Sequence, residues 1–300
     1  MISYPSFSRR KLLYLGGVAA LLGACSNNPS PPPPPRNLQW TVTNQTVTVT
    51  CDERSGSAIR TVTVRGYQMV QSPDHGAQIQ TACSMNGLGE QLNPTEAGSV
   101  PDGDKPTSSS KILGVTVSGQ TIQASSQLCY WYPYQGQTLS PITLDKKIEL
   151  GWNGMWNVIK DSRTLHNPNN YDSCQFECLT GYLNMTMNQL YSFDRASGQL
   201  TLTPYQNSTV FDPTKIVSFY APATYPILSL PDASQAMGVV VGPGMPGTGC
   251  WMGAGNYSNK WSSGQGFTPW PPGAYSWNIY MVVGTLEEVR QTMVTLISLI

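Results

Sequence analysis

The sequence predicts an all-β protein with one short helix at its C-terminal end. Charged residues make up only 11% of the 300-residue chain, whereas Gly (28) and Pro (24) are plentiful, as expected for many turns between short strands. Beyond residue 38, one segment after another alternates apolar and polar residues with a period of two. The last segment differs, because its apolar residues have helical spacing.

The first 25 residues have the pattern of an export signal. Arg9, Arg10 and Lys11 precede an apolar stretch, Leu12 to Leu22, that is too short to span a membrane as a helix. Leu22-Gly23-Ala24-Cys25 resembles the bacterial lipobox. The resemblance implies that Cys25 carries a lipid and begins the mature protein; the alternative is an ordinary signal peptide with an incidental cysteine.

The signal also indicates a route and a destination. Ser8-Arg9-Arg10-Lys11-Leu12-Leu13 resembles a twin-arginine (Tat) signal, although paired arginines occur in ordinary signals too. Ser26, rather than an aspartate, follows the cysteine, so the lipobox resemblance implies a lipid-anchored protein of the cell envelope at the outer membrane. The side of that membrane is left open.

A proline-rich tether and one large domain are expected to follow the signal. Residues 26–37 are polar and include Pro31 to Pro35, which favour an extended, semi-rigid spacer. Residues 38–300 are enough for one large domain with a sizeable core or for two small ones, and the absence of a second linker and of repeats favours one.

Charge excludes one class of partner. The chain has 17 basic and 17 acidic side chains, and removal of Arg9, Arg10 and Lys11 leaves 14 against 17, or about −3. No basic patch with interleaved aromatic residues is present, so nucleic acid is not an expected partner.

The remaining cysteines suggest disulfides. Six of the seven lie beyond Cys25, and an even number in an oxidising compartment suggests up to three bridges of unknown pairing: Cys51, Cys83, Cys129, Cys174, Cys178 and Cys250. Cys174 and Cys178 with His166 could suggest a metal, but the second close pair of a structural zinc site is missing. No metal is therefore expected.

Strands are expected wherever period-two runs lie between turn residues. Residues 38–43 and 45–50 alternate, and 58–64 repeats the pattern after a Ser-Gly-Ser turn. Residues 112–124 have the pattern of a hairpin with Ser118-Gly119 as its turn. Further strands are expected at 145–151, 155–160, 176–183, 189–194, 199–203, 216–220, 236–241 and 275–283.

The C-terminal helix has a start signal and an apolar stripe. Thr285 and Glu288 fit the two positions of a capping box. The stripe that would pack on a sheet consists of Leu286, Val289, Met293, Leu296, Ile297 and Ile300.

Residues 74–99 hold the densest set of functional side chains, among turn residues that indicate a loop. A histidine near carboxylates can share proton transfer, and amides and carboxylates match sugar hydroxyls. The alternative is that Asp74, Asn93 and Glu96 only hold the loop backbone. The set comprises Asp74, His75, Gln78, Glu90, Asn93 and Glu96.

His166 and a set of aromatic residues complete the candidates. His166 is the only other histidine, in an Asn/Pro-rich stretch that is also typical of a surface loop. Trp131, Trp261 and Trp270 lie in Gly/Pro-rich surroundings and could stack on sugar rings. Trp152, Trp156 and Trp277 fall within strand patterns and are expected in the core. No nucleophile elbow, metal-binding His-Glu-x-x-His or phosphate loop is present, so no cofactor is expected.

Several segments, taken together and in order, resemble the galactose mutarotase-like β-supersandwich over nearly all of 38–300. That resemblance implies a large antiparallel β-supersandwich with a short C-terminal helix. The segments are 59–64 with Gly66, 74–80, 93–98, 157–159, 177–182, 191–194, 236–239 and 275–278.

What the resemblance implies about activity is less definite. Epimerases of that superfamily use a histidine as acid at the ring oxygen and a glutamate as base at the anomeric hydroxyl, whereas other members are lyase domains or non-catalytic. The motif around those residues is not recognisable here, and the early arginine of the epimerases corresponds to Ala77. Fold analogy alone does not choose between binding and catalysis.

The sequence therefore predicts an envelope lipoprotein that binds or processes carbohydrate, with possible epimerase- or lyase-like chemistry. The alternative is a non-catalytic structural or interaction lipoprotein. Catalytic candidates are His75, His166, Glu96 and Glu177, with Glu90 as a further carboxylate; carbohydrate-binding candidates are Asp74, Gln78, Asn93, Trp131, Trp261 and Trp270.

Overall fold

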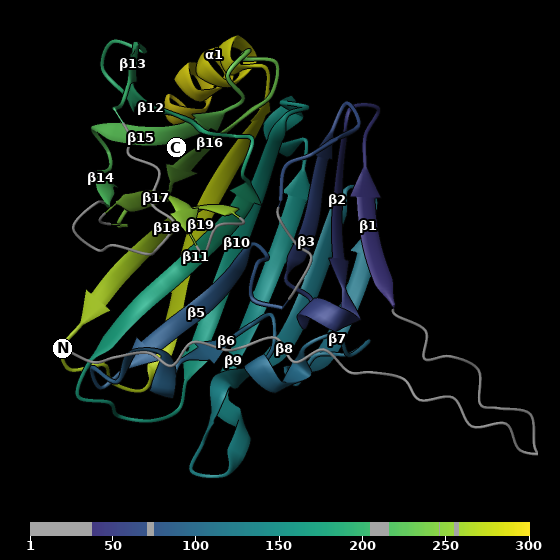
Figure 1. The fold of residues 1–300 in the computed structure, drawn as a ribbon, viewed down its shortest axis with the longest axis vertical. Helices are drawn as coiled ribbons and strands as arrows, with labels where there is room; N and C mark the ends of the chain where they lie inside the picture. The colour runs from purple at the N-terminus through teal and green to yellow at the C-terminus, as the bar shows by residue number, and fades with distance from the viewer. Residues whose placement is uncertain (1–37, 71–74, 205–215, 246, 255–257) are drawn as a thin grey trace, which may run out of the picture. The chain divides into compact units, whose positions relative to one another are not determined.

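A computed structural model describes residues 38–70, 75–204, 216–245, 247–254 and 258–300. It confirms the predicted class: antiparallel strands make up two sheets, and one α-helix lies near the C-terminal end (Figure 1). The signal, Cys25 and the tether lie outside the described residues. In the described part of the chain, no helix has the length and apolarity needed to cross a membrane.

The smaller sheet is formed by the N-terminal strands of the domain, in the order β1-β2-β3-β4. Val49 and Val62 lie opposite each other on β2 and β3, and both side chains are fully buried. Thr50 and Thr61 are the next pair and face the other way, as period two requires. The strands are β1 (Gln39–Thr43), β2 (Val47–Asp52), β3 (Ile59–Val64) and β4 (Tyr67–Gln68).

The larger sheet contains all the other strands, in the order β13-β12-β15-β16-β19-β10-β9-β8-β6-β5-β11-β18-β17-β14, with β7 paired to β8. These are β5 (Gln80–Met85), β6 (Pro94–Thr95), β7 (Lys111–Ser118), β8 (Thr121–Tyr134), β9 (Gln137–Leu150), β10 (Val158–Asn167), β11 (Cys174–Asn184), β12 (Gln189–Asp194), β13 (Leu200–Leu202), β14 (Val217–Phe219), β15 (Thr224–Ser229), β16 (Ala236–Val241), β17 (Thr248–Ala254), β18 (Ser258–Phe267) and β19 (Gly273–Gly284).

Helix α1 (Leu286–Ile297) begins at the predicted cap. Thr285 accepts a hydrogen bond from the Glu288 backbone N–H, and the Glu288 carboxylate accepts one from the Thr285 N–H. The helix lies against β16, where a Cβ added at Gly238 would approach Met293 Sδ to 2.5 Å. The buried positions of the stripe join one apolar cluster that includes residues from both sheets.

Some elements differ from the sequence prediction. The segment expected as a loop, 74–99, contains β5 and β6, whose side chains are buried on both faces and so show no alternation. Strands β15, β17 and β18 were not predicted, and β10 begins at Val158 because Gly151 and Asn153 turn the chain with positive φ. The hairpin of β7 and β8 forms as predicted, with Gly119 at φ +55°.

The disulfide prediction is wrong for this structure. The six described cysteines are all free and buried. Cys83 and Cys174 are diagonal neighbours on β5 and β11 and their thiols are hydrogen-bonded, but no S–S bond joins them, and Cys51 lies opposite Ile59. Burial raises the pKa of the Cys51 thiol to about 12, so this thiol is a protonated, apolar part of the core.

Candidate functional site

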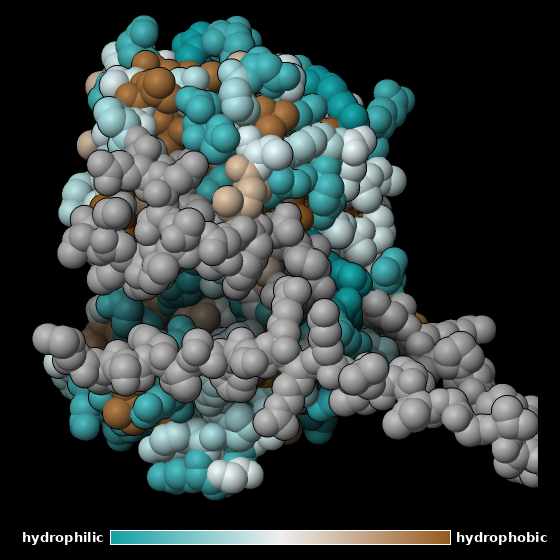
Figure 2. Space-filling view, in the orientation of Figure 1, coloured by the Kyte–Doolittle hydropathy of each residue, from teal (hydrophilic) through white to brown (hydrophobic). Residues whose placement is uncertain are grey.

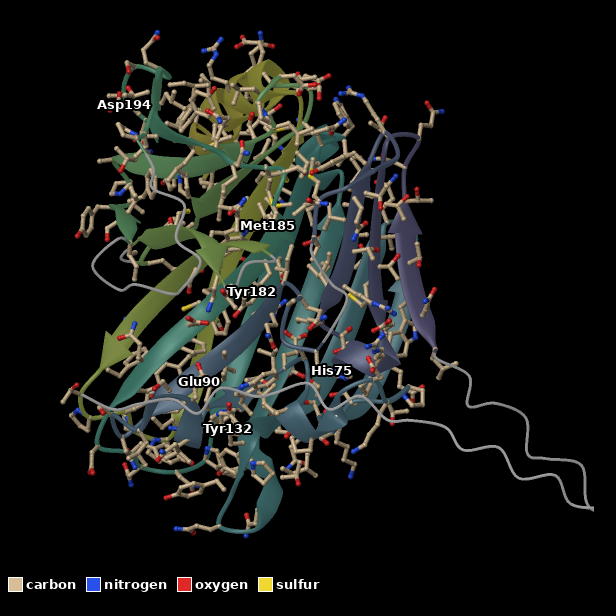
Figure 3. The ribbon with its side chains drawn as sticks, viewed as in Figure 1. His75, Glu90, Tyr132, Tyr182, Met185 and Asp194 are labelled. Carbon is tan, nitrogen blue, oxygen red and sulfur yellow. The ribbon has the colours of Figure 1, made fainter. Side chains whose placement is uncertain are left out.

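A pocket of about 170 Å³ collects side chains that are far apart in the sequence. It is formed by the loop before β5, by the 3₁₀ turn Gly89–Leu92, and by β6, β8, β11 and β18. Figure 3 labels His75, Glu90 and Tyr182, which line it. Its other polar and aromatic side chains are Gln80, Asn93, Thr95, Trp131, Glu177, Thr180 and Lys260.

His75 is held in one orientation by the backbone. Its Nδ1 lies 2.6 Å from the Gly103 carbonyl oxygen, which can only accept, so Nδ1 donates. In the neutral ring Nε2 is then an acceptor. This atom is buried and has no hydrogen-bond partner among the described residues. The Nε2 lone pair of His75 can therefore accept a hydrogen bond from a ligand.

Asn93 presents a second acceptor in the same pocket. Its Nδ2 donates to Glu90 Oε2 at 2.9 Å, which fixes the amide orientation. Asn93 Oδ1 is therefore the remaining polar atom, and it too is buried without a partner in the described structure. Leaving a buried acceptor unsatisfied costs about 1–3 kcal/mol, so a ligand that donates to these atoms gains affinity.

A β-bulge brings Glu177 and Tyr182 to the same face of β11. They are separated by an odd number of positions, which in a regular strand places them on opposite faces. The register with β18 shifts between Glu177 and Leu179, and the residues opposite them, Gly264 and Lys260, then share a face. The extra residue at the bulge thus directs Glu177 into the pocket.

Lys260 joins Glu177 to Tyr182. Its Nζ lies 3.3 and 3.4 Å from the two Glu177 carboxylate oxygens and 5.0 Å from the centre of the Tyr182 ring. Burial lowers the pKa of Lys260, but attraction to Glu177 and Tyr182 outweighs burial and raises it above its ordinary value. The ammonium is therefore charged at neutral pH.

Trp131 packs against the backbone of Gly76. A Cβ added at Gly76 would lie 2.7 Å from Trp131 Cη2, and Gly76 has φ +89°. Only glycine meets both conditions without strain. The half-buried Trp131 ring thus contributes an aromatic surface to the pocket wall.

Other predicted site residues lie elsewhere. Glu96 has no exposed surface. Its carboxylate forms salt bridges with the buried side chains of Lys146 and Arg163. Arg163 also forms a salt bridge with Asp161 at 2.8 Å. Burial raises the pKa of Glu96, but Arg163 and Lys146 outweigh this and lower it. Glu96 is a structural charge and not part of the pocket, contrary to the prediction.

The tryptophan predictions are partly wrong. Trp261 and Trp270 are fully buried, and Trp270 stacks on Tyr171 at 5.6 Å, so neither can stack on a ligand. Trp156, expected in the core, is 37% exposed and lies under Arg65 at 5.3 Å. Trp277 is buried as expected.

The remaining candidates are near the pocket, distant from it, or not described. Gln78 is buried and does not line the pocket. His166 lies on β10, outside the pocket, with Nε2 2.9 Å from Asp145 Oδ2. Asp74 is outside the described residues. No group of three or more His, Cys, Asp or Glu side chains in the described ranges is arranged to hold a metal ion.

Lys260 and Tyr182 were not found by sequence reasoning. Lys260 precedes Trp261 in one strand, and alternation sends one of them to the pocket and the other to the core. The only available signal was a single lysine in a weakly charged, aromatic segment. A single lysine does not indicate which face of the strand lines the pocket and which face packs in the core.

No family model matches the chain, and neither does any curated protein. Among solved structures, a GalM/aldose epimerase homologue from Caenorhabditis elegans matches with a TM-score of 0.51 at 9% identity, covering 84% of this chain and 100% of that one. A putative aldose 1-epimerase from Escherichia coli K12 has a TM-score of 0.49 at 8% identity, covering 84% and 100%. At such identity the likeness concerns the fold, which is a galactose mutarotase-like β-sandwich.

Proposed function

We propose that the protein binds one sugar ring in the pocket lined by His75, Asn93, Trp131 and Glu177. The observation that carries this proposal is the pair of buried, unpaired acceptors, His75 Nε2 and Asn93 Oδ1. A sugar presents several hydroxyl donors around one compact ring, and its C–H face suits the Trp131 ring.

Pocket size and charge support the same ligand class. About 170 Å³ is small beside the roughly 300–1,000 Å³ of pockets for drug-sized ligands, and it suits a single ring. The carboxylate of Glu177 is paired with Lys260, so the pocket does not select a strongly charged ligand. The C. elegans structural neighbour is described as an aldose epimerase homologue, which agrees with a sugar ligand.

A second candidate is turnover of the bound sugar. Epimerisation at the anomeric carbon needs one group that removes the hydroxyl proton and another that protonates the ring oxygen. His75 and Glu177 line the same pocket and supply two titratable groups. In this candidate the Glu177 carboxylate removes the proton of the anomeric hydroxyl, and His75 carrying a proton on Nε2 gives that proton to the ring oxygen; the two groups exchange roles when the ring closes again.

We also propose that the domain is held at the cell envelope by a lipid on Cys25. The supporting observation is the short apolar stretch that ends in Leu22-Gly23-Ala24-Cys25. Replacement of Cys25 by Ser should abolish incorporation of a labelled fatty acid. Labelling that survives the replacement would contradict the anchor.

The test of the pocket is saturation-transfer NMR on the full chain with a panel of neutral monosaccharides. We expect contact with at least one sugar, reduced at least tenfold in His75→Ala and unchanged in His166→Ala, because His166 lies outside the pocket. Exchange spectroscopy on the same samples separates the two candidates: faster interconversion of anomers means an epimerase, and contact alone means a binding protein. Contact with no sugar would favour the structural lipoprotein instead.

A further inference from the structure

A second and larger concavity lies on other strands. A groove of about 920 Å³ crosses β8, β9, β10 and β19, with β7 along one side, and none of its lining residues belongs to the pocket. On β10, Asp161, Arg163 and Leu165 point into the core, so Ser162, Thr164 and His166 point outward. The groove is thus the outer face of the sheet.

Strand register places small polar side chains in rows across this face. Ser125, Asp145, Thr164 and Ser276 are successive partners on β8, β9, β10 and β19. Ser125 Oγ donates to Asp145 Oδ1, and the Thr164 and Ser276 hydroxyls are 2.8 Å apart. Neighbouring strands are ~4.8 Å apart, so the row extends over roughly 14 Å.

A parallel row continues the same surface. Gln123, Lys147, Ser162 and Asn278 are also successive partners, and Ser162 Oγ donates to Asn278 Oδ1 at 2.6 Å. The two rows offer hydroxyl and amide groups at a regular spacing. Such a surface matches a ligand that repeats hydroxyl groups along its length.

The charged side chains of the groove are already paired. Asp145 pairs with His166 at 2.9 Å, and Lys147 pairs with Glu149 at 2.8 Å. Lys146 and Arg163 are bonded to Glu96 in the core. Each charged side chain of the groove therefore has a bonding partner and no cluster of like charges lines it, so charge complementarity favours an uncharged partner over a polyanion or a polycation.

A β-bulge shapes the side of the groove. The register of β7 with β8 shifts between Ile112 and Gly114, so Leu113 is the inserted residue. Its side chain is 53% exposed and lines the groove. An apolar side chain beside polar rows suits the mixed C–H and hydroxyl surface of a sugar chain.

We propose that this groove is a second binding site, for an extended, uncharged polysaccharide that runs across β8, β9, β10 and β19. The groove has several times the volume of the pocket and exceeds one ring in length. The groove contains no residue of the pocket, so polysaccharide binding in the groove can be tested independently of sugar binding in the pocket.

The test is native affinity electrophoresis of the full chain in gels that contain dextran, hydroxyethyl cellulose, mannan or polygalacturonate. The groove variant is Thr164→Ala with Ser276→Ala, which removes one exposed cross-strand hydroxyl pair. The matched control is Thr41→Ala with Thr50→Ala, an equivalent exposed pair on β1 and β2. Thermal unfolding checks that both variants fold.

We expect at least one neutral polymer to retard the protein, with at least fivefold weaker binding for the groove variant and no change for the control. His75→Ala should be retarded like the unmodified protein even if it loses contact with monosaccharides. Retardation by polygalacturonate alone, by no neutral polymer, or equally in the groove variant would overturn the proposal. So would a loss of retardation confined to His75→Ala.

Discussion

Gly76 shapes the pocket through the absence of a side chain. The Trp131 ring occupies the space where a Cβ would lie, and the backbone has φ +89°. Gly66, in the turn between β3 and β4, has a similar φ of +83°, but a Cβ added there would have no atom within 4 Å. The two glycines therefore separate backbone strain from contact with the aromatic ring.

Gly76→Ala should weaken sugar binding more than Gly66→Ala does. Both changes place alanine at positive φ, which costs about 1–2 kcal/mol. Gly76→Ala must also displace Trp131, which adds about 1–3 kcal/mol. Urea unfolding measures the stability of both variants, and the NMR contact experiment measures binding. Equal effects on binding would show that Trp131 does not form the pocket wall.

Glu96 has a residue type suited to catalysis, but its place between Lys146 and Arg163 in the core makes it structural. Glu96→Gln should destabilise the protein by about 3–5 kcal/mol, because it leaves buried cations without compensation. Glu149→Gln is the matched control, since it breaks the partly exposed pair with Lys147 and should cost at most about 1 kcal/mol. Urea unfolding at pH 7 measures the free energy of unfolding of both variants. Similar losses of stability in Glu96→Gln and Glu149→Gln would contradict the structural role of Glu96.

The same carboxylate makes stability depend on pH in a defined direction. The pKa of Glu96 is lower in the folded protein than its ordinary value of 4.5. Its contribution is therefore present above the unfolded-state pKa and is lost as pH falls below that value. Urea midpoints measured from pH 6 to pH 3 should fall more steeply for the unmodified protein than for Glu96→Gln. Parallel curves would show that Glu96 is not the group responsible.

At the scale of elements, α1 is attached to the fold at its first turn. Glu288 closes the capping box and also pairs with Arg65, at the end of β3, through two bonds of 2.6 and 2.8 Å. The hydrogen bond from Arg65 is the main reason that the pKa of Glu288 is lowered to about 2. One side chain thus joins the helix start to the smaller sheet.

Glu288→Ala should lower the free energy of unfolding by about 1–2 kcal/mol, because it removes a helix cap and a partly exposed ion pair. Glu287→Ala is the control on the same helix, because Glu287 pairs only locally with Arg290 and Gln291. Thermal unfolding at pH 7 should show the Tm of the Glu288 variant lowered by a few degrees and that of the control by less. The difference should shrink as pH falls from about 4.5 towards 2, through the range between the unfolded and folded pKa values of Glu288.

At the scale of the whole molecule, a single apolar cluster includes residues of both sheets and of α1. Figure 2 shows a mostly polar surface on the side it displays, with apolar side chains gathered near β12 and β15. The pocket and the groove lie on different parts of the larger sheet and share no lining residue. The one core therefore supports two separate concave surfaces.

The six buried cysteines give a test of this packing. Burial raises the pKa of Cys129 to about 12, and the other thiols of the domain are buried too. We expect these six thiols to react with a thiol reagent only after denaturation, as counted by mass spectrometry. Rapid labelling before unfolding would contradict the burial of these cysteines, and so would a disulfide between any pair other than Cys83 and Cys174, which are neighbours on β5 and β11.

Much of the fold could be predicted because the relevant forces are local. Period-two alternation identified β1, β2, β3 and the β7–β8 hairpin, and the capping box identified the start of α1. Strands buried on both faces, such as β5, show no alternation, and that part of the fold was not predicted. Among site residues, His75, Asn93, Trp131 and Glu177 were selected by residue type, and the structure places them in one pocket.

The sequence by itself determined which alternating segments are strands, where the helix starts and which residue types could bind a sugar. Tertiary structure decided which face each residue occupies. Lys260 and Trp261 are neighbours in β18, yet one lines the pocket and the other is fully buried. The physical reason is that a period-two pattern is the same on either face, so pairing register and the bulge at Glu177 assign each side chain to the core or to the site.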